Sequence, residues 1–312
     1  MFSGEVMDTT NEIKWGKPLF DTNLSSLFYG QWRASKNKPW LNVVFKCFPS
    51  QIPRTYHEHK IRQCFEKETQ FLQTLSEIEP NGTFYMKLHC VLETEDKLML
   101  VLEKGGEDVF EHFAKLRDHD STRSAKVITC VRSMIQCLSM LHVHSLAHND
   151  VKPENYVFRT ASTNDKCEVS LIDFGFSSHD KTPCGTSCEG TEMFIHPHMY
   201  SAVSPSRMQN DLFAIGVSLF ILFPGSFPLE ITASDFDRMA VRTSFFDGSW
   251  QQSKSISNTV KQLPKFAEWC DLVCKLCNGY WAFANDDILT HPFFIQMEPA
   301  LLSPHKKRKQ VY

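Results

Sequence analysis

The sequence predicts an α+β fold of two lobes, a small β-rich lobe with one key helix followed by a larger, mainly α-helical lobe. Strand-like patterns dominate roughly the first hundred residues, whereas helical periodicity dominates beyond the dipeptide Gly105-Gly106. With 312 residues, 42% of them hydrophobic and 25 of them Phe, the chain can bury one large core or two adjoining smaller ones.

Two segments of the first lobe each carry one charged residue in apolar surroundings. Residues 41–48 are dense in Val and Phe, which favours a strand buried on both faces, and Lys46 lies in the middle of it. Residues 57–75 repeat apolar side chains at helical spacing, and Glu68 falls on that stripe. A buried charge is costly unless it is paired, so each can satisfy the other. A plain buried ion pair without a ligand is the alternative.

The next segments complete the first lobe and begin the second. Residues 84–92 and 97–102 have a hairpin pattern around a polar turn. Residues 103–106 read as a connection, and residues 124–143 place apolar side chains on one face of a long core helix. The longest apolar stretch, residues 212–224, is too short to cross a bilayer and predicts a buried helix.

Composition bounds the class of partner and the location. The net charge of −3 argues against nucleic acid or an anionic membrane as the main partner of the folded body. Residues 1–17 contain no continuous apolar run, so neither a signal peptide nor a transit peptide is visible. An intracellular protein is expected. Residues 244–262, rich in Ser, Gln and Asn, predict a surface excursion.

Several of the eleven cysteines lie in helical or strand patterns, and the chain is too long for a disulfide scaffold, so free thiols are expected. Cys270, Cys274 and Cys277 fall at helical spacing with leucines, which favours a helix face over a metal site. A Cys/His metal module is the weaker alternative, and its further candidate ligands are Cys184, Cys188, His196 and His198.

The most informative feature is a pair of motifs near the middle of the chain. Residues 148–155 read His-Asn-Asp-Val-Lys-Pro-Glu-Asn, and residues 171–175 read Leu-Ile-Asp-Phe-Gly. Two carboxylates, an amide and an ammonium at these spacings are what Mg²⁺-dependent transfer of a phosphoryl group to a hydroxyl requires. The chain resembles the eukaryotic protein kinase family, of the serine/threonine type and in a divergent form.

The resemblance implies a role for each residue of the motifs. Asp150 would accept the proton of the substrate hydroxyl, and Lys152 would offset charge on the γ phosphate. Asn155 and Asp173 would hold Mg²⁺ through hard oxygen atoms. Lys46, in Val-Val-Phe-Lys, would grip the α and β phosphates of ATP. The helix glutamate described above would hold this lysine in place.

The resemblance extends to the adenine pocket and to the class of substrate. Leu102 would guard the back of the pocket, and backbone groups beside Glu103 would hydrogen-bond the adenine. Gly190-Thr191 resembles the Gly-Thr of serine/threonine kinases, and Asp211 matches the aspartate that anchors the catalytic loop. The expected partners are ATP and a protein substrate, and the expected cofactor is Mg²⁺. Acidic residues near the cleft, such as Glu107, Asp108 and Glu111, either favour basic peptides, contact the ribose, or form a solvated helix start.

The resemblance also divides the chain. It predicts an N-terminal extension over 1–14 and a kinase domain over 15–295, with an N-lobe over about 15–102 and a C-lobe over about 107–295. A basic tail over 296–312 follows.

The tail contains a compact basic run, Lys306-Lys307-Arg308-Lys309, that resembles a nuclear-import signal. A nuclear-import receptor is therefore a candidate partner, and a cytoplasmic or nuclear location, or both, is expected. A merely solubilising terminus is the alternative.

The chain departs from the family pattern at three places, and the missing glycines and His198 motivate a second interpretation. The segment 20–27, where the family has its glycine-rich loop, contains no glycine. Asn149 replaces an arginine that in many kinases receives a phosphate on the activation segment. His198 and Ala282 replace both partners of a buried ion pair, a joint loss that can be nearly neutral. A pseudokinase, which binds or scaffolds a partner with weak or no ATP turnover, is therefore the alternative to an active kinase.

Overall fold

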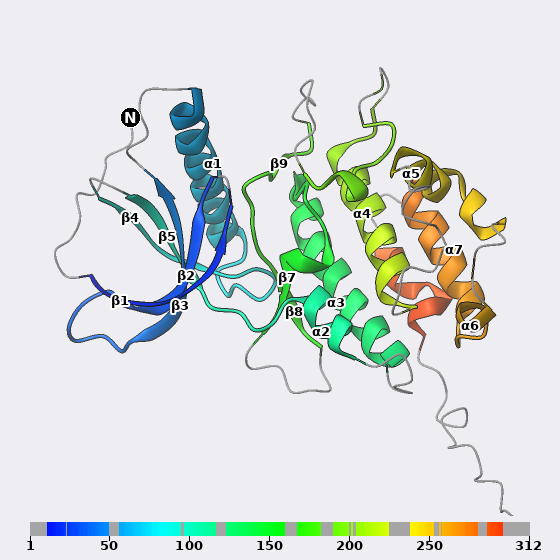
Figure 1. Cartoon of the computed structure of the whole chain (residues 1–312), viewed down its shortest axis with the longest axis horizontal. Coiled ribbons are helices and arrows are strands. Elements are labelled where there is room, and N and C mark those ends of the chain that lie inside the picture. Colours follow the sequence, from blue (N-terminus) through cyan, green and yellow to red (C-terminus); the bar gives the residue numbers. More distant parts are fainter. Residues whose placement is uncertain are drawn as a thin grey trace, which may run out of the picture.

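The computed structural model has two lobes joined by a short connection (Figure 1). A β-sheet dominates the first lobe and helices dominate the second, as the sequence predicts. The structure describes residues 11–22, 24–49, 56–94, 97–116, 123–159, 167–181, 190–199, 201, 204–224, 238–252, 256, 258–279 and 286–295.

The N-lobe is a five-stranded antiparallel sheet with one helix packed against it. The strands lie in the order β1-β2-β3-β5-β4, and α1 lies between β3 and β4 in the chain. Figure 1 shows the curved sheet on the left with α1 beside it. The elements are β1 (Glu12–Asp21), β2 (Ser26–Arg33), β3 (Leu41–Pro49), α1 (Tyr56–Ile78), β4 (Leu88–Glu93) and β5 (Lys97–Glu103).

Alternation along β3 aims Lys46 at α1. Val43 and Phe45 are fully buried in a cluster on one face of the sheet. Because side chains alternate along a strand, Lys46 and Phe48 point to the opposite face, where α1 packs. The helix predicted over 57–75 and the strand predicted over 41–48 are confirmed.

The start of the predicted hairpin has a different role from the one expected. Residues 84–86 precede β4 and pair with the C-lobe instead of joining the N-lobe sheet. The N–H of Met86 donates to the carbonyl of Leu171 over 3.1 Å, and the N–H of Leu171 donates to the carbonyl of Phe84 over 2.9 Å. Strand patterns alone do not reveal the partner of a segment, and this pairing joins the two lobes behind the connection.

The C-lobe is mainly helical, with two short β-ribbons on the side that faces the N-lobe (Figure 1). Strand β6 pairs with β9, and β7 pairs with β8. The elements are α2 (Val109–Lys115), α3 (Arg123–Val143), β6 (Leu146–Ala147), β7 (Tyr156–Phe158), β8 (Val169–Leu171), β9 (Ser178–His179), α4 (Arg207–Leu222), α5 (Arg238–Asp247), α6 (Asn258–Lys261) and α7 (Phe266–Cys277).

Two helices form the centre of this lobe. Helix α3 matches the core helix predicted over 124–143, and α4 matches the predicted apolar helix and is buried along most of its length. A capping box starts α4: the Ser206 side chain accepts from the N–H of Gln209, and the Gln209 side chain accepts from the N–H of Ser206. Among the described residues, no helix has the length and apolar character needed to span a membrane.

The prediction of a surface excursion over 244–262 is wrong for the residues of this range that the structure describes, 244–252, 256 and 258–262. Part of α5, a short 3₁₀ turn and α6 lie in this region. Phe245 and Trp250 are fully buried and pack edge-on against Phe220 of α4, with ring centroids 4.6 and 5.0 Å apart. The many polar residues of this segment make its average composition resemble that of a surface loop. Its few aromatic side chains nevertheless bury it against α4, because each of them covers a large apolar area.

The cysteine prediction is tested only in part. Cys270, Cys274 and Cys277 lie on α7, and the first and last of them are buried. Cys184 and Cys188 lie outside the described residues. In the part of the chain that the structure describes, no three or more His, Cys, Asp or Glu side chains are grouped as a metal site.

Candidate active site

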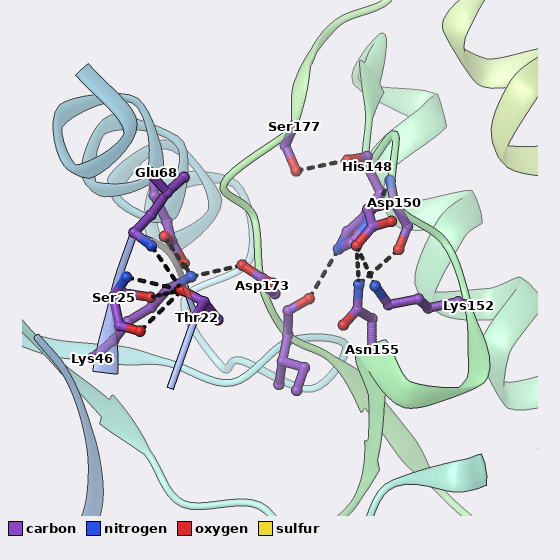
Figure 2. A network of polar contacts seen from close by, with 12 residues as sticks. Thr22, Ser25, Lys46, Glu68, His148, Asp150, Lys152, Asn155, Asp173 and Ser177 are labelled. Carbon is purple, nitrogen blue, oxygen red and sulfur yellow. Dashed lines mark hydrogen bonds and ion pairs between the residues drawn. The ribbon is translucent and has the colours of Figure 1, made fainter. Parts of the chain in front are cut away.

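Lys46 of β3, Glu68 of α1 and Asp173 form a buried ionic cluster between the lobes. The Lys46 ammonium nitrogen lies 2.8 Å from Glu68 Oε2 and 2.6 Å from Asp173 Oδ1. Lys46 is 7% exposed and Glu68 only 2%, whereas the side chain of Asp173 is 41% exposed. Figure 2 shows Asp173 between Lys46 on one side and Asp150, Lys152 and Asn155 on the other. Asp173 is therefore the member of the cluster that a ligand can reach from solvent.

Mutual pairing favours the ionised forms of Lys46 and Asp173. Burial alone would lower the pKa of Lys46, but the two carboxylates outweigh it and raise that pKa above its usual value. Burial tends to raise the pKa of Asp173, but the Lys46 ammonium overrides this and lowers it. Burial raises the pKa of Glu68. Two acidic groups against one ammonium favour a further cation beside Asp173.

Asp150 is held from two sides by hydrogen bonds. Its Oδ1 accepts from the backbone N–H and from the hydroxyl of Thr191, both over 2.8 Å. Its Oδ2 accepts from Lys152 Nζ over 2.8 Å and from Asn155 Nδ2 over 2.9 Å. Lys152 also donates to the Thr191 hydroxyl over 2.8 Å. These bonds fix the orientation of a carboxylate that is only 3% exposed.

Thr191 is a site residue whose contacts the sequence did not reveal. The Gly-Thr signature marked it as a sign of substrate class, but the structure places its hydroxyl between the carboxylate and the ammonium of the catalytic loop. About forty residues separate it from Asp150 in the chain, and residues 182–189 between them lie outside the described part.

A buried aspartate of α4 supports the catalytic loop from below. Asp211 accepts the backbone N–H groups of His148 and Asn149, each over 2.8 Å, and lies 3.0 Å from His142 Nε2. Asn149 has a φ of 66°, a left-handed conformation that is costly for most side chains. The two hydrogen bonds to Asp211 stabilise that turn, as the match of Asp211 to the family's anchoring aspartate implied.

The Asn149 side chain holds the segment that follows Asp173. Its Nδ2 donates to the carbonyl of Phe176 over 2.8 Å and to Ser178 Oγ over 3.0 Å. An amide thus occupies the place where the family has a cation, and it binds neutral partners. This contact does not depend on a phosphate.

Asn155 and Asp173 present the kind of oxygen atoms that Mg²⁺ prefers. Asn155 Nδ2 donates to the backbone carbonyl and to the carboxylate of Asp150, so its Oδ1 points away from Asp150 (Figure 2). Asp173 uses Oδ1 for Lys46 and retains a second carboxylate oxygen. Mg²⁺ commonly takes one or two protein oxygens and completes its shell with phosphates and water. The residues present therefore fit this ion.

The backbone groups of the connection between the lobes differ in their hydrogen bonding. Leu102 is half-buried at the end of β5, and the N–H of Glu103 donates to the carbonyl of Lys87 over 2.7 Å. Among the described residues, the backbone of Gly105 makes no hydrogen bond. An added Cβ at Gly105 would meet Val157 at 2.4 Å, so only glycine lets the chain lie this close to β7. In the sequence, the dipeptide Gly105-Gly106 is the feature that indicates this close approach of the backbone to β7.

Acidic residues after the connection serve the start of α2. Asp108 caps the helix by accepting the N–H of Glu111 over 2.8 Å. Glu107 contacts His112 and Lys115, and Glu111 pairs with Lys115 over 2.7 Å. These contacts favour the helix-start interpretation over a peptide site.

Aromatic packing lies where the family has a buried ion pair. The rings of His196 and His198 both pack edge-on against Phe246, with centroids 4.9 and 4.8 Å apart. Burial, and then the neighbouring His198, lower the pKa of His196 to about 4, so its ring is neutral at physiological pH. Ala282 lies outside the described residues.

The turn between β1 and β2 replaces the glycine-rich loop of the family pattern. Thr22 and Ser25 hydrogen-bond to each other through backbone and side-chain atoms. Figure 2 shows both side chains converging beside Lys46.

Comparison with known proteins agrees with this geometry. The family described as "Protein kinase domain" matches residues 42–278, more than half of the chain. This chain belongs to the protein kinase family. The pair Lys46–Glu68 and the pair Lys152–Asp150 lie on facing sides of the junction between the lobes.

Curated relatives point to the same family at modest identity. The chain is 28% identical to serine/threonine-protein kinase 33 of Mus musculus over 234 residues, covering 70% of this chain and 46% of that protein. It is 25% identical to Aurora kinase A-A of Xenopus laevis over 293 residues, covering 91% of this chain and 62% of that protein. It is 30% identical to serine/threonine-protein kinase DCLK3 of Homo sapiens over 178 residues, covering 56% and 25%. The chain thus spans less than two thirds of the length of these relatives.

Proposed function

We propose that this kinase domain transfers the γ phosphoryl group of ATP to a serine or threonine hydroxyl of a protein, with Mg²⁺ as cofactor. The observation that carries the proposal is the arrangement around Asp150. Its carboxylate lies beside the Lys152 ammonium and is oriented by four donors from three residues. A base must be held in place before its substrate arrives, and this carboxylate is.

The side chains divide the reaction between them. Asp150 accepts the proton of the substrate hydroxyl as the new oxygen–phosphorus bond forms and the bond to the β-phosphate oxygen breaks. Lys152 places its positive charge where negative charge develops on the transferred group. Lys46, held by Glu68, binds the phosphates, and Asp173 and Asn155 hold Mg²⁺. When bound, Mg²⁺ neutralises phosphate charge and orients the leaving group.

A second candidate is a binding module without turnover. The turn at Thr22–Ser25 favours it, because that turn is closed on itself and contains no glycine. A cleft that does not hold the phosphates well would bind ATP weakly while the fold remained intact.

Two measurements separate the candidates. Mg²⁺-ATP at saturating concentration must raise the thermal midpoint of a protein that binds it, and adenosine with Mg²⁺ serves as the control ligand. Incubation with labelled ATP and a generic basic protein then tests transfer, with Asp150→Ala as the matched inactive variant. A midpoint shift without transfer above the Asp150→Ala background would favour the binding module. No shift at all would remove ATP from the proposal.

The location and the tail are proposals of a different kind, because residues 296–312 lie outside the described part. The basic run at 306–309 supports a nuclear or mixed location through an import receptor. Fusion of residues 296–312 to a fluorescent protein tests this. Equal distribution of the fusion and of a version with alanines at 306–309 would contradict it.

A further inference from the structure

The side chain of Thr22 lies at the centre of the turn that faces the junction of the lobes. Its Oγ1 accepts the backbone N–H of Leu24 over 3.1 Å and that of Ser25 over 2.9 Å, and it donates to the carbonyl of Ser25 over 2.9 Å. The N–H of Thr22 donates to the same carbonyl over 2.8 Å. Three backbone N–H groups of the turn are therefore already bonded within the turn.

Strand register places this turn at the edge of the nucleotide site. Asp21 pairs with Ser26 where the turn closes, and Leu27 pairs with Lys46 one position further on. The Leu24 side chain packs against the core cluster that includes Phe48, on the α1 side of the sheet. Figure 2 shows the turn next to Lys46 and Glu68. The turn therefore lies on the side where the phosphates of a bound nucleotide would meet the ammonium of Lys46.

Consecutive backbone N–H groups that converge on one point form an anion-binding concavity. In this turn two of them converge on the hydroxyl oxygen of Thr22, which has the position relative to these donors that a phosphate oxygen would have. Resting on the proposed function, we infer that Thr22 is a built-in substitute for a phosphate oxygen and sets the affinity of the site for polyphosphate groups. A nucleotide must displace the hydroxyl before the turn can donate to it.

The inference predicts a gain of affinity from losing a hydrogen-bonding group. Thr22→Val keeps the shape of the side chain and replaces the hydroxyl with a methyl group, which cannot accept a hydrogen bond, so the N–H groups of Leu24 and Ser25 lose their acceptor within the turn. Two recovered hydrogen bonds to a charged acceptor should lower the Kd for Mg²⁺-ATP by about tenfold. The Kd for adenosine, which has no phosphate, should not change. Thr22→Ser retains the hydroxyl and is the matched control, with wild-type affinity expected for both ligands.

Amide hydrogen exchange without nucleotide supplies a readout that does not depend on ATP binding. The N–H groups of Leu24 and Ser25 should exchange slowly in the wild type and in Thr22→Ser, and faster in Thr22→Val. Fast exchange in the wild type would overturn the inference, because the hydroxyl would not be holding these groups.

The two assays together distinguish failure of this inference from failure of the proposed function. If the wild type binds Mg²⁺-ATP, and Thr22→Val frees the amides without changing that Kd, the inference is overturned and the proposed function stands. An equal gain for adenosine and Mg²⁺-ATP also overturns it, since the effect would not concern phosphates. If none of the three proteins binds Mg²⁺-ATP, the proposed function fails and the inference fails with it.

Discussion

Hydrogen bonds have different roles on the C-lobe side and on the N-lobe side of the candidate site. On the C-lobe side, the donors around Asp150 converge on an acceptor that the proposed reaction uses. On the N-lobe side, the backbone donors of the turn around Thr22 converge on a side-chain hydroxyl that, in our inference, takes the place of a phosphate oxygen. Hydrogen bonds orient the carboxylate of Asp150 on the C-lobe side. On the N-lobe side they engage the backbone N–H groups of Leu24 and Ser25, so that these groups are not available to a ligand. A complete set of motif residues therefore does not tell whether the backbone donors beside them are available.

The largest expected effect tests whether the C-lobe side is catalytic. Asp150→Asn keeps the size of the side chain but removes the base, so kcat should fall roughly a thousandfold while the Kd for Mg²⁺-ATP changes little. Phosphate transfer to a protein substrate and equilibrium binding of ATP measure the two quantities. Transfer at the wild-type rate would rule out the role of Asp150 as the base.

The next effect concerns the cluster that lies between the regions. Lys46→Met leaves the carboxylate of Glu68 buried without its ammonium, so the free energy of unfolding should fall by about 3 kcal/mol. The double variant with Glu68→Met removes both charges and should recover most of that loss. Urea unfolding at neutral pH without nucleotide measures both. If the double variant were as unstable as the single one, packing and not charge would hold this pair.

The C-lobe side should also show a pH dependence that originates at His196. Its pKa is about 4 in the folded protein, below the ordinary value of 6.5 that applies when unfolded. Between these values the unfolded chain binds more protons, so stability falls as the pH falls from about 6.5 toward 4, by about 3 kcal/mol in total.

His196→Phe provides the control for this prediction. Phenylalanine preserves ring contacts with Phe213 and Phe246 but does not titrate. The slope of unfolding free energy against pH in this window should be smaller in the variant than in the wild type. Equal slopes would place the acid sensitivity on other groups, among them the paired carboxylates.

Some features of the fold and of the candidate site can be predicted from the sequence, and others cannot. Lys46 and Glu68 were paired from sequence because a lone charge in an apolar pattern needs a partner, and the structure places them 2.8 Å apart. The periodicity of apolar residues predicts strand β3 and helices α1 and α3. These predictions depend on local pattern and on simple charge balance.

The remaining features depend on contacts that no local pattern encodes. Thr22 is an ordinary polar residue in the sequence, and only the closed turn gives its hydroxyl a role. Trp250 lies in a polar stretch, but its ring is buried against α4. Thr191 meets Asp150 across a long gap in the chain. In each case a distant or turn-specific contact decides the role, and residue type alone does not.

The smallest expected effect comes from the same change, threonine to valine, made at one position on each side of the site. Thr191→Val removes the hydroxyl that donates to Asp150 and accepts from Lys152, while the backbone N–H of residue 191 still holds the carboxylate. We expect kcat to fall about tenfold with little change in the KM for ATP, and Thr191→Ser to restore it. Thr22→Val should instead tighten ATP binding. If both valine variants lowered kcat and left ATP binding unchanged, the two hydroxyls would have similar roles. The proposed contrast between the Thr191 hydroxyl, which orients Asp150, and the Thr22 hydroxyl, which engages backbone donors, would then be wrong.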